Sequence, residues 1–347
     1  MILYGGCLVE TNIGDCIESM RKMPEQSVQC CVTSPPYFGL RDYGHEGQIG
    51  LEQTPDTYVA KMVEVFREAW RVLRDDGVLW LNLGDSYVSQ GGLHDGRTDN
   101  QAGVGAKRVW REGSGRADGV VDNRGQRNRN GLTVPGIAPK NLIGIPWRVA
   151  FALQADGWYL RQDIIWHKPN PMPESVTDRC TKAHEYIFML TKNARYYYDA
   201  AAIKEPAKYI DKSNGKTIYK SAAAYDGKHS DKQRGHGRRH AGFNDRWDAM
   251  TKEEQQATGA NKRDVWTVAT KPFKGSHFAT FPPDLIEPCI LAGSKPGDIV
   301  LDPFGGSGTV AGVSVKHGRN AILCELNPEY AALVPARIQQ ITGGTDA

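Results

Sequence analysis

Residues 299–325 read IVLDPFGGSGTVAGVSVKHGRNAILCE. Short apolar runs near both ends predict two buried strands, and the apolar residues over 309–316 predict a helix between them. A strand, a glycine-rich loop, a helix and a second strand in this order form a unit whose two strands run parallel. The loop lies where α/β sheets bind ligands, outside the carboxyl ends of the strands. The stretch therefore predicts an α/β fold with a ligand site at the loop.

The chemistry of this loop favours a nucleoside that carries a cationic group. Glu325 ends the second strand, where an acidic side chain can accept hydrogen bonds from both hydroxyls of a ribose. A phosphate-binding loop would need a lysine after Gly308, and a dinucleotide-binding loop would need a third glycine; both are missing. Asp302, at the entrance of the loop, favours a cationic ligand such as S-adenosylmethionine over a pyrophosphate.

A second motif, Thr33-Ser34-Pro35-Pro36-Tyr37, follows a predicted buried strand over 28–32. Neither proline can donate a hydrogen bond to a neighbouring strand, so the strand must end there in a stiff corner. Such a corner holds a serine hydroxyl, a proline carbonyl and an aromatic ring in fixed positions, which are the groups needed to hold a flat ring with an amine. The same five residues also suit an ordinary strand-ending loop with a packed tyrosine.

The rest of the chain supplies further elements of an α/β fold. A helix is predicted after a turn at Gly14-Asp15, with Ile17, Met20 and Met23 on one face, and further helices are predicted over 54–73, 145–155, 285–292 and 329–341. Strands are predicted over 78–83, 158–167 and 185–190. Asp75-Asp76-Gly77 is predicted to be the turn that separates the second helix from the following strand.

Composition excludes several other classes of protein. The 347 residues are 40% hydrophobic and 24% charged, as is usual for globular proteins. There is no apolar run of about 18 residues that could span a bilayer, and the first residues do not resemble a signal peptide, so we expect a cytoplasmic location and no membrane partner. The seven cysteines contain no C-x-x-C pair, which predicts neither a metal site nor a disulfide framework.

Basic charge is concentrated in two polar segments. Residues 91–140 contain 9 Lys and Arg against 5 Asp and Glu, and residues 200–263 contain 14 against 8. Basic segments interleaved with aromatic residues suit a polyanionic partner such as DNA. Solvated charged loops would explain the same composition.

The two motifs together resemble the exocyclic-amino DNA methyltransferases. With the serine motif first and the glycine-rich motif last, their order is similar to that of the β group of this family, whose target-recognition region lies between them. The similarity continues through Gly14-Asp15, residues 165–171, His184-Glu185 and residues 281–283. It implies an S-adenosylmethionine-dependent methyltransferase (Rossmann-like) fold, with a mostly parallel seven-stranded sheet and helices on both faces. The implied segments are a catalytic half of the core (1–84), a basic insert (85–140), a continuation of the core (141–195), a target-recognition region (196–270) and a cofactor-binding half (271–347).

The resemblance also implies the site residues. S-adenosyl-L-methionine would be held by Asp15, Phe281, Pro283, Asp302, Phe304, Gly305, Gly306, Ser307, Gly308, Thr309 and Glu325. The catalytic residues would be Ser34, Pro35, Pro36 and Tyr37. Tyr37 would stack on a base extruded from duplex DNA, while Ser34 and the Pro35 carbonyl accept hydrogen bonds from its amine.

Some residues are candidates for contacts with DNA. Candidates for the DNA surface or the base pocket are Arg41, Lys168, Asn170, Arg234, Arg238 and Arg239. Lys168 and Asn170 could equally be turn residues, and the arginines could belong to solvated loops. A homodimer is possible by analogy with the family.

The target base and some rival functions stay open at this point. Serine at position 34 resembles the version of the motif found more often with cytosine-N4 targets, and adenine-N6 is the alternative. Pro288-Cys289 could mimic the nucleophile of a cytosine-C5 enzyme, but it lies in a predicted helix and reads as core. The rival functions are methylation of RNA or of a protein amide, and DNA binding without catalysis. A solitary enzyme of bacterial or phage origin, with any partner nuclease encoded separately, is expected.

Overall fold

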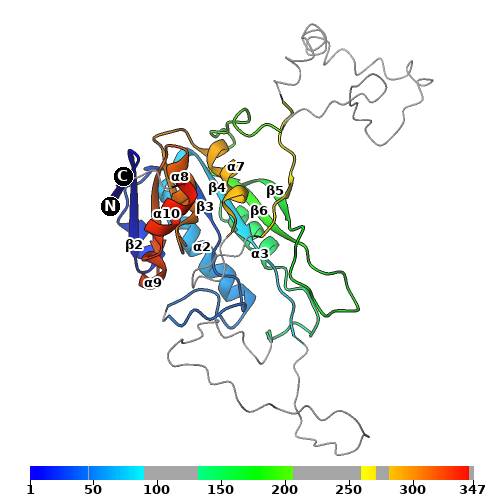
Figure 1. Ribbon diagram of the computed structural model, residues 1–347. Coiled ribbons are helices and arrows are strands. Elements are labelled where there is room, and N and C mark those ends of the chain that lie inside the picture. The colour runs from blue at the N-terminus through cyan, green and yellow to red at the C-terminus, as the bar shows by residue number, and fades with distance from the viewer. Residues whose placement is uncertain (46, 90–131, 206–258, 271–280, 344–347) are drawn as a thin grey trace, which may run out of the picture. The chain divides into compact units, whose positions relative to one another are not determined.

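The computed structural model describes residues 1–45, 47–89, 132–205, 259–270 and 281–343 (Figure 1). The chain divides into two compact units, one of residues 1–197 and 265–347 and one of residues 198–264. The second unit falls inside the segment predicted to be the target-recognition region, and the assignment of that role stays a prediction. The described sheet, helices and cavity all belong to the first unit.

The first unit is built on one mixed sheet of nine strands among the described residues, in the order β1-β2-β9-β8-β3-β4-β6-β5-β7. Five strands that are neighbours in the sheet, β2, β9, β8, β3 and β4, run parallel to one another. β6 runs antiparallel to both β4 and β5. The predicted seven-stranded, mostly parallel sheet is confirmed, and a three-residue strand extends it at each edge. The strands are β1 (Ile2–Tyr4), β2 (Cys7–Ile13), β3 (Val28–Thr33), β4 (Leu73–Leu83), β5 (Tyr159–His167), β6 (His184–Thr191), β7 (Val265–Thr267), β8 (Ile299–Asp302) and β9 (Asn320–Glu325).

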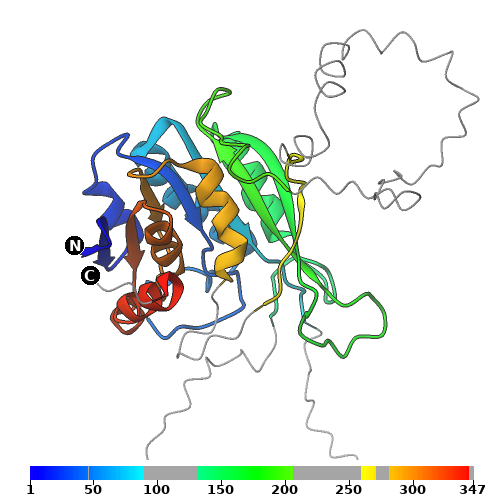
Figure 2. The ribbon, with the colours of Figure 1, turned by 45° about the horizontal axis from the view of Figure 1, so that its top comes forward.

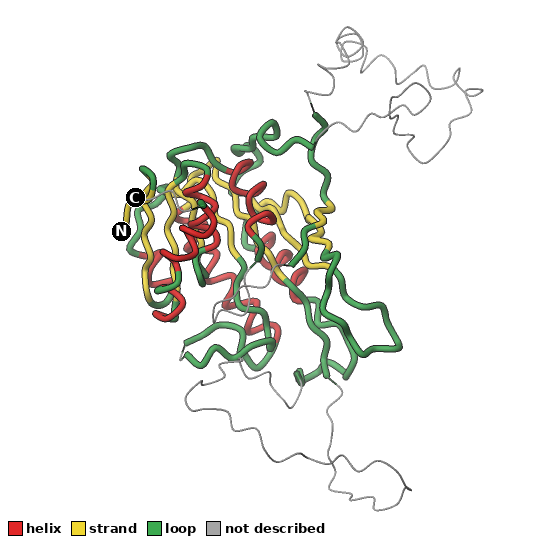
Figure 3. Tube along the Cα trace, in the orientation of Figure 1, coloured by secondary structure: helices red, strands yellow, loops and turns green. Residues whose placement is uncertain are grey.

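Helices cover both faces of this sheet, as Figures 2 and 3 show. One layer contains α1, α2 and α3, and the other contains α7, α8 and α10. Side chains alternate between the two faces along each strand. Cys31 and Leu79 belong to the core beneath the first layer, while Cys30 and Trp80 lie so close to Gly293 of α7 that no side chain would fit at that position. The helices are α1 (Cys16–Arg21), α2 (Pro55–Val72), α3 (Ile145–Ala155), α7 (Pro283–Gly293), α8 (Thr309–Lys316), α9 (Pro328–Ala331) and α10 (Val334–Thr342). None of the helices in the described segments combines the length and the hydrophobicity needed to cross a bilayer.

Two predicted boundaries are wrong. Asp75-Asp76-Gly77 does not separate α2 from the next strand, because β4 already begins at Leu73 and carries these residues as an irregularity between its pairs with Val28 and Cys30. The single helix expected over 329–341 is two helices, α9 and α10. Pro335 explains the break, since it cannot donate a backbone hydrogen bond and its ring would clash with the carbonyl of Ala331.

The topology places both sequence motifs at one edge of the sheet. β3 and β8 are parallel neighbours, so Thr33 and Asp302, which end them, lie side by side. β6 is antiparallel, so its first residues, His184 and Glu185, lie at this same edge beside the end of β4. This edge is where a doubly wound sheet binds its ligands.

Candidate active site

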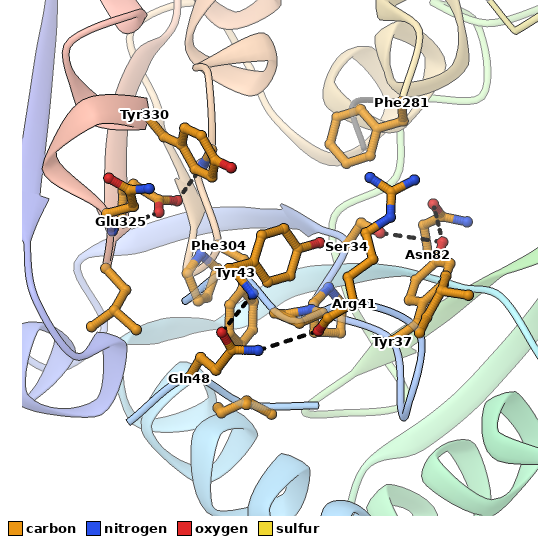
Figure 4. A pocket seen from close by; sticks show the side chains of 18 of the residues that line it. Ser34, Tyr37, Arg41, Tyr43, Gln48, Asn82, Phe281, Phe304, Glu325 and Tyr330 are labelled. Atoms are coloured by element: carbon orange, nitrogen blue, oxygen red, sulfur yellow. Dashed lines mark hydrogen bonds between the residues drawn. The ribbon is translucent and has the colours of Figure 1, made fainter. Parts of the chain in front are cut away.

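A cavity of about 760 Å³ opens at this edge (Figure 4). Of the residues predicted for the site, it is lined by Asp15, Ser34, Pro35, Pro36, Tyr37, Arg41, Lys168, Asn170, Phe281, Phe304, Gly306 and Glu325. Six predicted cofactor residues, namely Pro283, Asp302, Gly305, Ser307, Gly308 and Thr309, do not line it. Arg234, Arg238 and Arg239 lie outside the described residues. The two motifs thus share one cavity, although much of the glycine-rich loop lies behind the cavity wall and does not line it.

The serine corner is held from several sides. Pro35 is buried, and the carbonyl of Pro36 accepts a 2.8 Å hydrogen bond from the hydroxyl of Tyr58 on α2. The Tyr37 ring lies against the backbone of Gly84, where an added Cβ would come within 2.5 Å of a ring carbon. The corner is therefore stiff because of packing as well as because of its two prolines.

The hydroxyl of Tyr37 is tied to two polar side chains below the cavity. It donates to Glu185 Oε2 at 2.7 Å and approaches Asn82 Oδ1 at 3.2 Å, and Ser34 Oγ donates to it at 3.4 Å. Burial, and then the negative charge of Glu185, hold the pKa of Tyr37 well above its usual value. Tyr37 therefore keeps its proton and remains a hydrogen-bond donor.

Glu185 also forms an ion pair at the cavity wall. Lys168 Nζ donates to Glu185 Oε1 and lies 4.2 Å from the centre of the Trp166 ring. Asn170 exchanges two hydrogen bonds with the backbone of Thr270, at 2.9 and 3.0 Å, which joins the end of β5 to the segment after β7. Lys168 and Asn170 thus take part in the turn after β5, and they line the cavity as well.

Glu325 organises the opposite end of the cavity. Its carboxylate accepts hydrogen bonds from the backbone N–H of Gly306 at 2.7 Å and of Asn327 at 2.8 Å. Burial raises the pKa of Glu325. The loop lies directly on β9, because a Cβ at Gly305 would come 2.8 Å from the Cβ of Leu323. Only glycine allows this close approach.

Asp302 supports the loop from beneath and is only 2% exposed. Its Oδ1 accepts hydrogen bonds from Thr33 Oγ1 at 2.6 Å and from the Phe304 N–H at 3.0 Å. Burial raises the pKa of Asp302 to about 7, although these two hydrogen bonds oppose the shift. Thr309 likewise turns away from the cavity and accepts a hydrogen bond from Arg337 at 3.3 Å.

Aromatic side chains form much of the cavity wall, as Figure 4 shows for Phe281, Phe304, Tyr43 and Tyr330. Tyr43 and Tyr330 meet edge to face, with ring centroids 6.5 Å apart. Apolar rings suit an adenine, and the Glu325 carboxylate suits the two hydroxyls of a ribose. These side chains fit the nucleoside part of S-adenosylmethionine.

Arg41 reaches the same cavity from the loop after the corner. Gln48 closes this loop, donating to the Arg41 carbonyl at 3.2 Å and accepting from the Tyr43 N–H at 2.7 Å. Arg41 Nη1 is buried and has no hydrogen-bond partner within the described part of the chain. A buried guanidinium nitrogen without a partner suits an anionic group in the cavity.

Several lining residues were not assigned a role from the sequence, among them Tyr43, Gln48, Asn82, Glu185, Asn327 and Tyr330. Two of them could have been found from the sequence, because each is a polar residue in an apolar strand: Asn82 lies in β4 and Glu185 lies at the start of β6. Burying such a residue requires hydrogen-bond partners, and these two are partners of each other at 3.3 Å.

Comparisons with known proteins agree with this site. Residues 28–335 match the N6/N4 DNA methylase family. The type II methyltransferase M.Cfr9I of Citrobacter freundii is 43% identical over 337 residues, which cover 97% of this chain and 89% of the relative. The type II methyltransferase M.SmaI of Serratia marcescens is 42% identical over 327 residues, which cover 94% and 89%.

Solved structures show the same fold. TTHA0409 of Thermus thermophilus, in complex with S-adenosyl-L-methionine, matches with a TM-score of 0.54 and 21% identity over 97% of this chain and 96% of its own. The cytosine-N4-specific PvuII DNA methyltransferase matches with a TM-score of 0.56 and 17% identity over 97% and 90%. The predicted methyltransferase fold is thereby confirmed.

The match to the family covers most of the chain, and both relatives are aligned over nearly their whole length. The chain therefore belongs to the N6/N4 DNA methylase family and is an S-adenosylmethionine-dependent DNA methyltransferase.

Proposed function

We propose that the enzyme methylates the N4 amine of a cytosine that is extruded from duplex DNA and held at the Ser34–Tyr37 corner. The observation that carries this proposal is that Ser34, Pro35 and Tyr37 line the same cavity as Phe304 and Glu325. A methyl acceptor at the first group of residues would therefore face a cofactor held by the second.

Bound S-adenosylmethionine would supply an electrophilic methyl group on a sulfonium. The protein's contribution is to hold the amine in position and to stabilise the charge that develops on its nitrogen. Ser34 Oγ and the Pro35 carbonyl accept hydrogen bonds from the amine, which directs the nitrogen lone pair toward the methyl carbon. Tyr37 contributes the face of its ring to the base. No covalent bond between enzyme and base is needed.

The cofactor contacts divide into two groups. Glu325 would bind the ribose hydroxyls, and Phe281 and Phe304 would contact the adenine, with Asp15 completing the wall. Arg41 would bind the carboxylate of the methionine part. Its Nη1 is buried and has no hydrogen-bond partner within the described residues, which suits an anion inside the cavity better than a phosphate outside it. Asp302, Gly305, Ser307, Gly308 and Thr309 would act by shaping the loop, and Pro283 by starting α7.

The DNA surface is proposed from charge alone. The basic segments 85–140 and 196–270, including Arg234, Arg238 and Arg239, would contact the duplex and read its sequence, while Lys168 and Asn170 would line the base pocket. A cytoplasmic location, action beside a separately encoded restriction endonuclease, and a homodimer are further parts of the proposal.

The test is to incubate the enzyme with labelled S-adenosylmethionine and unmethylated duplex DNA, digest the DNA, and identify the methylated nucleoside by mass spectrometry. We expect N4-methylcytosine. N6-methyladenine would keep the DNA methyltransferase and refute the proposed base. Ser34→Ala should lower turnover sharply while the dissociation constant of the cofactor stays within about threefold of the wild-type value.

A further inference from the structure

The hydrogen-bond chain beneath the corner has a fixed direction. An ionised carboxylate can only accept hydrogen bonds, whereas a hydroxyl donates one and can accept others. Tyr37 OH lies closest to Glu185 Oε2, at 2.7 Å, so its single proton points to the carboxylate. The lone pairs of Tyr37 OH then face Ser34, whose Oγ donates to it at 3.4 Å. With its proton used in this way, Ser34 presents only lone pairs to the cavity.

Glu185 is itself fixed by donors on both of its oxygens. Lys168 Nζ donates a hydrogen bond to Oε1, and Asn82 Nδ2 donates one to Oε2 at 3.3 Å. Asn82 Nδ2 also donates to the carbonyl of Tyr186 at 3.0 Å, which holds Asn82 in place. The side chains of Lys168 and Glu185 are only 19% and 14% exposed, so little water competes for the ion pair. The carboxylate therefore has one position and one role toward Tyr37.

We propose that Glu185 is a positioning residue that sets the direction of this chain, so that Ser34 meets the base as a hydrogen-bond acceptor. The inference rests on the proposed contact between Ser34 and the target amine. It also predicts which base the corner prefers. The amine of the target base donates hydrogen bonds, whereas the carbonyl of its deaminated form only accepts them. The corner should therefore bind the amino base and reject the deaminated base, whose carbonyl oxygen would face the lone pairs of Ser34 Oγ.

The decisive variant is Glu185→Gln, which keeps the shape and removes the charge. Lys168 still requires an acceptor, so the glutamine carbonyl turns toward it and the amide N–H₂ faces Tyr37. Tyr37 then accepts from Gln and loses its strongest acceptor. Its proton is shared between Asn82 Oδ1, at 3.2 Å, and Ser34 Oγ, at 3.4 Å, and whenever it points to Ser34, the Ser34 proton turns into the cavity. The direction of the chain is then no longer fixed, with little change in packing.

The measurement is a ratio of dissociation constants for two duplexes in the presence of S-adenosylhomocysteine. One contains the amino target base, and the other contains its deaminated form, which is uracil for cytosine or hypoxanthine for adenine. Comparing the ratio between variants cancels the cost of extruding each base. We expect Glu185→Gln to shift the ratio by about three- to tenfold toward the deaminated base, with the cofactor dissociation constant unchanged.

A double variant supplies the matched control. Lys168→Met combined with Glu185→Gln removes the donor that forces the glutamine to turn, so its carbonyl can face Tyr37 again. Because Lys168 itself lines the cavity, the reference is Lys168→Met alone, and the ratio should return toward that of this single variant. A structural defect would not be repaired by a second substitution at the same ion pair. An unchanged ratio in Glu185→Gln, or no recovery in the double variant, would overturn the role of Glu185.

Ser34→Ala separates this inference from the proposed function. If Ser34→Ala abolishes the preference for the amino base and Glu185→Gln does not, Ser34 contacts the base but Glu185 does not direct it. If Ser34→Ala keeps the wild-type ratio, the proposed contact itself is refuted, and the inference with it.

Discussion

The hydroxyl of Thr33 donates a 2.6 Å hydrogen bond to the buried carboxylate of Asp302, although 269 residues separate the two in sequence. Thr33 precedes the serine corner, and Asp302 opens the glycine-rich loop. The same Asp302 oxygen accepts the N–H of Phe304, which lines the cavity. One short chain of hydrogen bonds therefore links the proposed amine-binding residues to the proposed cofactor-binding residues.

Thr33→Val should reveal the strength of this link. Valine keeps the shape of threonine but leaves Asp302 with one hydrogen bond fewer in a buried site, which should lower the free energy of unfolding by about 1–3 kcal/mol. Urea denaturation measures the loss. Thr33→Ser, which keeps the hydroxyl, is the control, and equal stability of Thr33→Val and wild type would contradict the argument.

Asp302→Asn should change the pH dependence of stability. Because folding raises the pKa of Asp302 from 3.8 to about 7, the folded state binds more protons than the unfolded state between these pH values. The stabilising contribution of Asp302 is thus full below about pH 4 and is lost as the pH rises to about 7. Asparagine can accept both hydrogen bonds through Oδ1 without carrying a charge.

The variant should therefore gain stability relative to wild type as the pH rises, by roughly 3 kcal/mol between pH 5 and pH 8. Urea denaturation at pH 5 and at pH 8 gives the comparison, and Thr33→Ser serves as a variant that should show the wild-type trend. A difference that is the same at both pH values would mean that Asp302 does not titrate in this range.

The sequence predicted the features that depend on local pattern. The strand, glycine-rich loop and helix after Ile299 and the two prolines after Ser34 are short-range signals, and both regions lie where the pattern indicates. The site residues brought together by topology were harder to foresee. Glu185 reaches the cavity only because β6 runs antiparallel to β4, which puts the start of a strand at the edge where the other strands end.

Burial within the loop was also beyond the sequence. Asp302 and Thr309 carry polar groups in a glycine-rich motif, which favoured direct contact with a ligand, yet both satisfy partners of the protein itself. Spacing cannot distinguish a side chain that faces the cavity from one that supports its floor. The break between α9 and α10, in contrast, could have been predicted, because Pro335 cannot continue the helix that precedes it.

Gly84→Ala should disturb Tyr37 without altering its chemistry. The new methyl group would lie 2.5 Å from a carbon of the Tyr37 ring, so the ring must shift. We expect turnover to fall by about tenfold or more, because a small displacement of a positioning group is costly in catalysis. Steady-state kinetics measure the fall.

Cofactor affinity in Gly84→Ala should stay near the wild-type value, because Gly84 does not line the cavity and the added methyl group would meet only Tyr37. Calorimetric titration with S-adenosylmethionine checks this, and thermal unfolding shows whether the fold is intact. Wild-type turnover in a folded variant would show that the position of Tyr37 is unimportant.

Arg41→Met tests what the guanidinium of Arg41, whose Nη1 is buried, binds. If Arg41 holds the carboxylate of the cofactor, its loss should weaken S-adenosylmethionine by about ten- to a hundredfold, the range expected for a charge-assisted hydrogen bond. Decarboxylated S-adenosylmethionine lacks only that group, so its dissociation constant should change less than about threefold by the same argument. Calorimetric titration of both ligands into wild type and Arg41→Met measures these changes.

Arg41→Lys is the control, because it keeps the charge and should lose less affinity for S-adenosylmethionine than Arg41→Met. An equal loss of affinity for the two ligands would show that Arg41 shapes the cavity instead of binding the carboxylate. A loss of affinity for duplex DNA alone would show that Arg41 binds a phosphate.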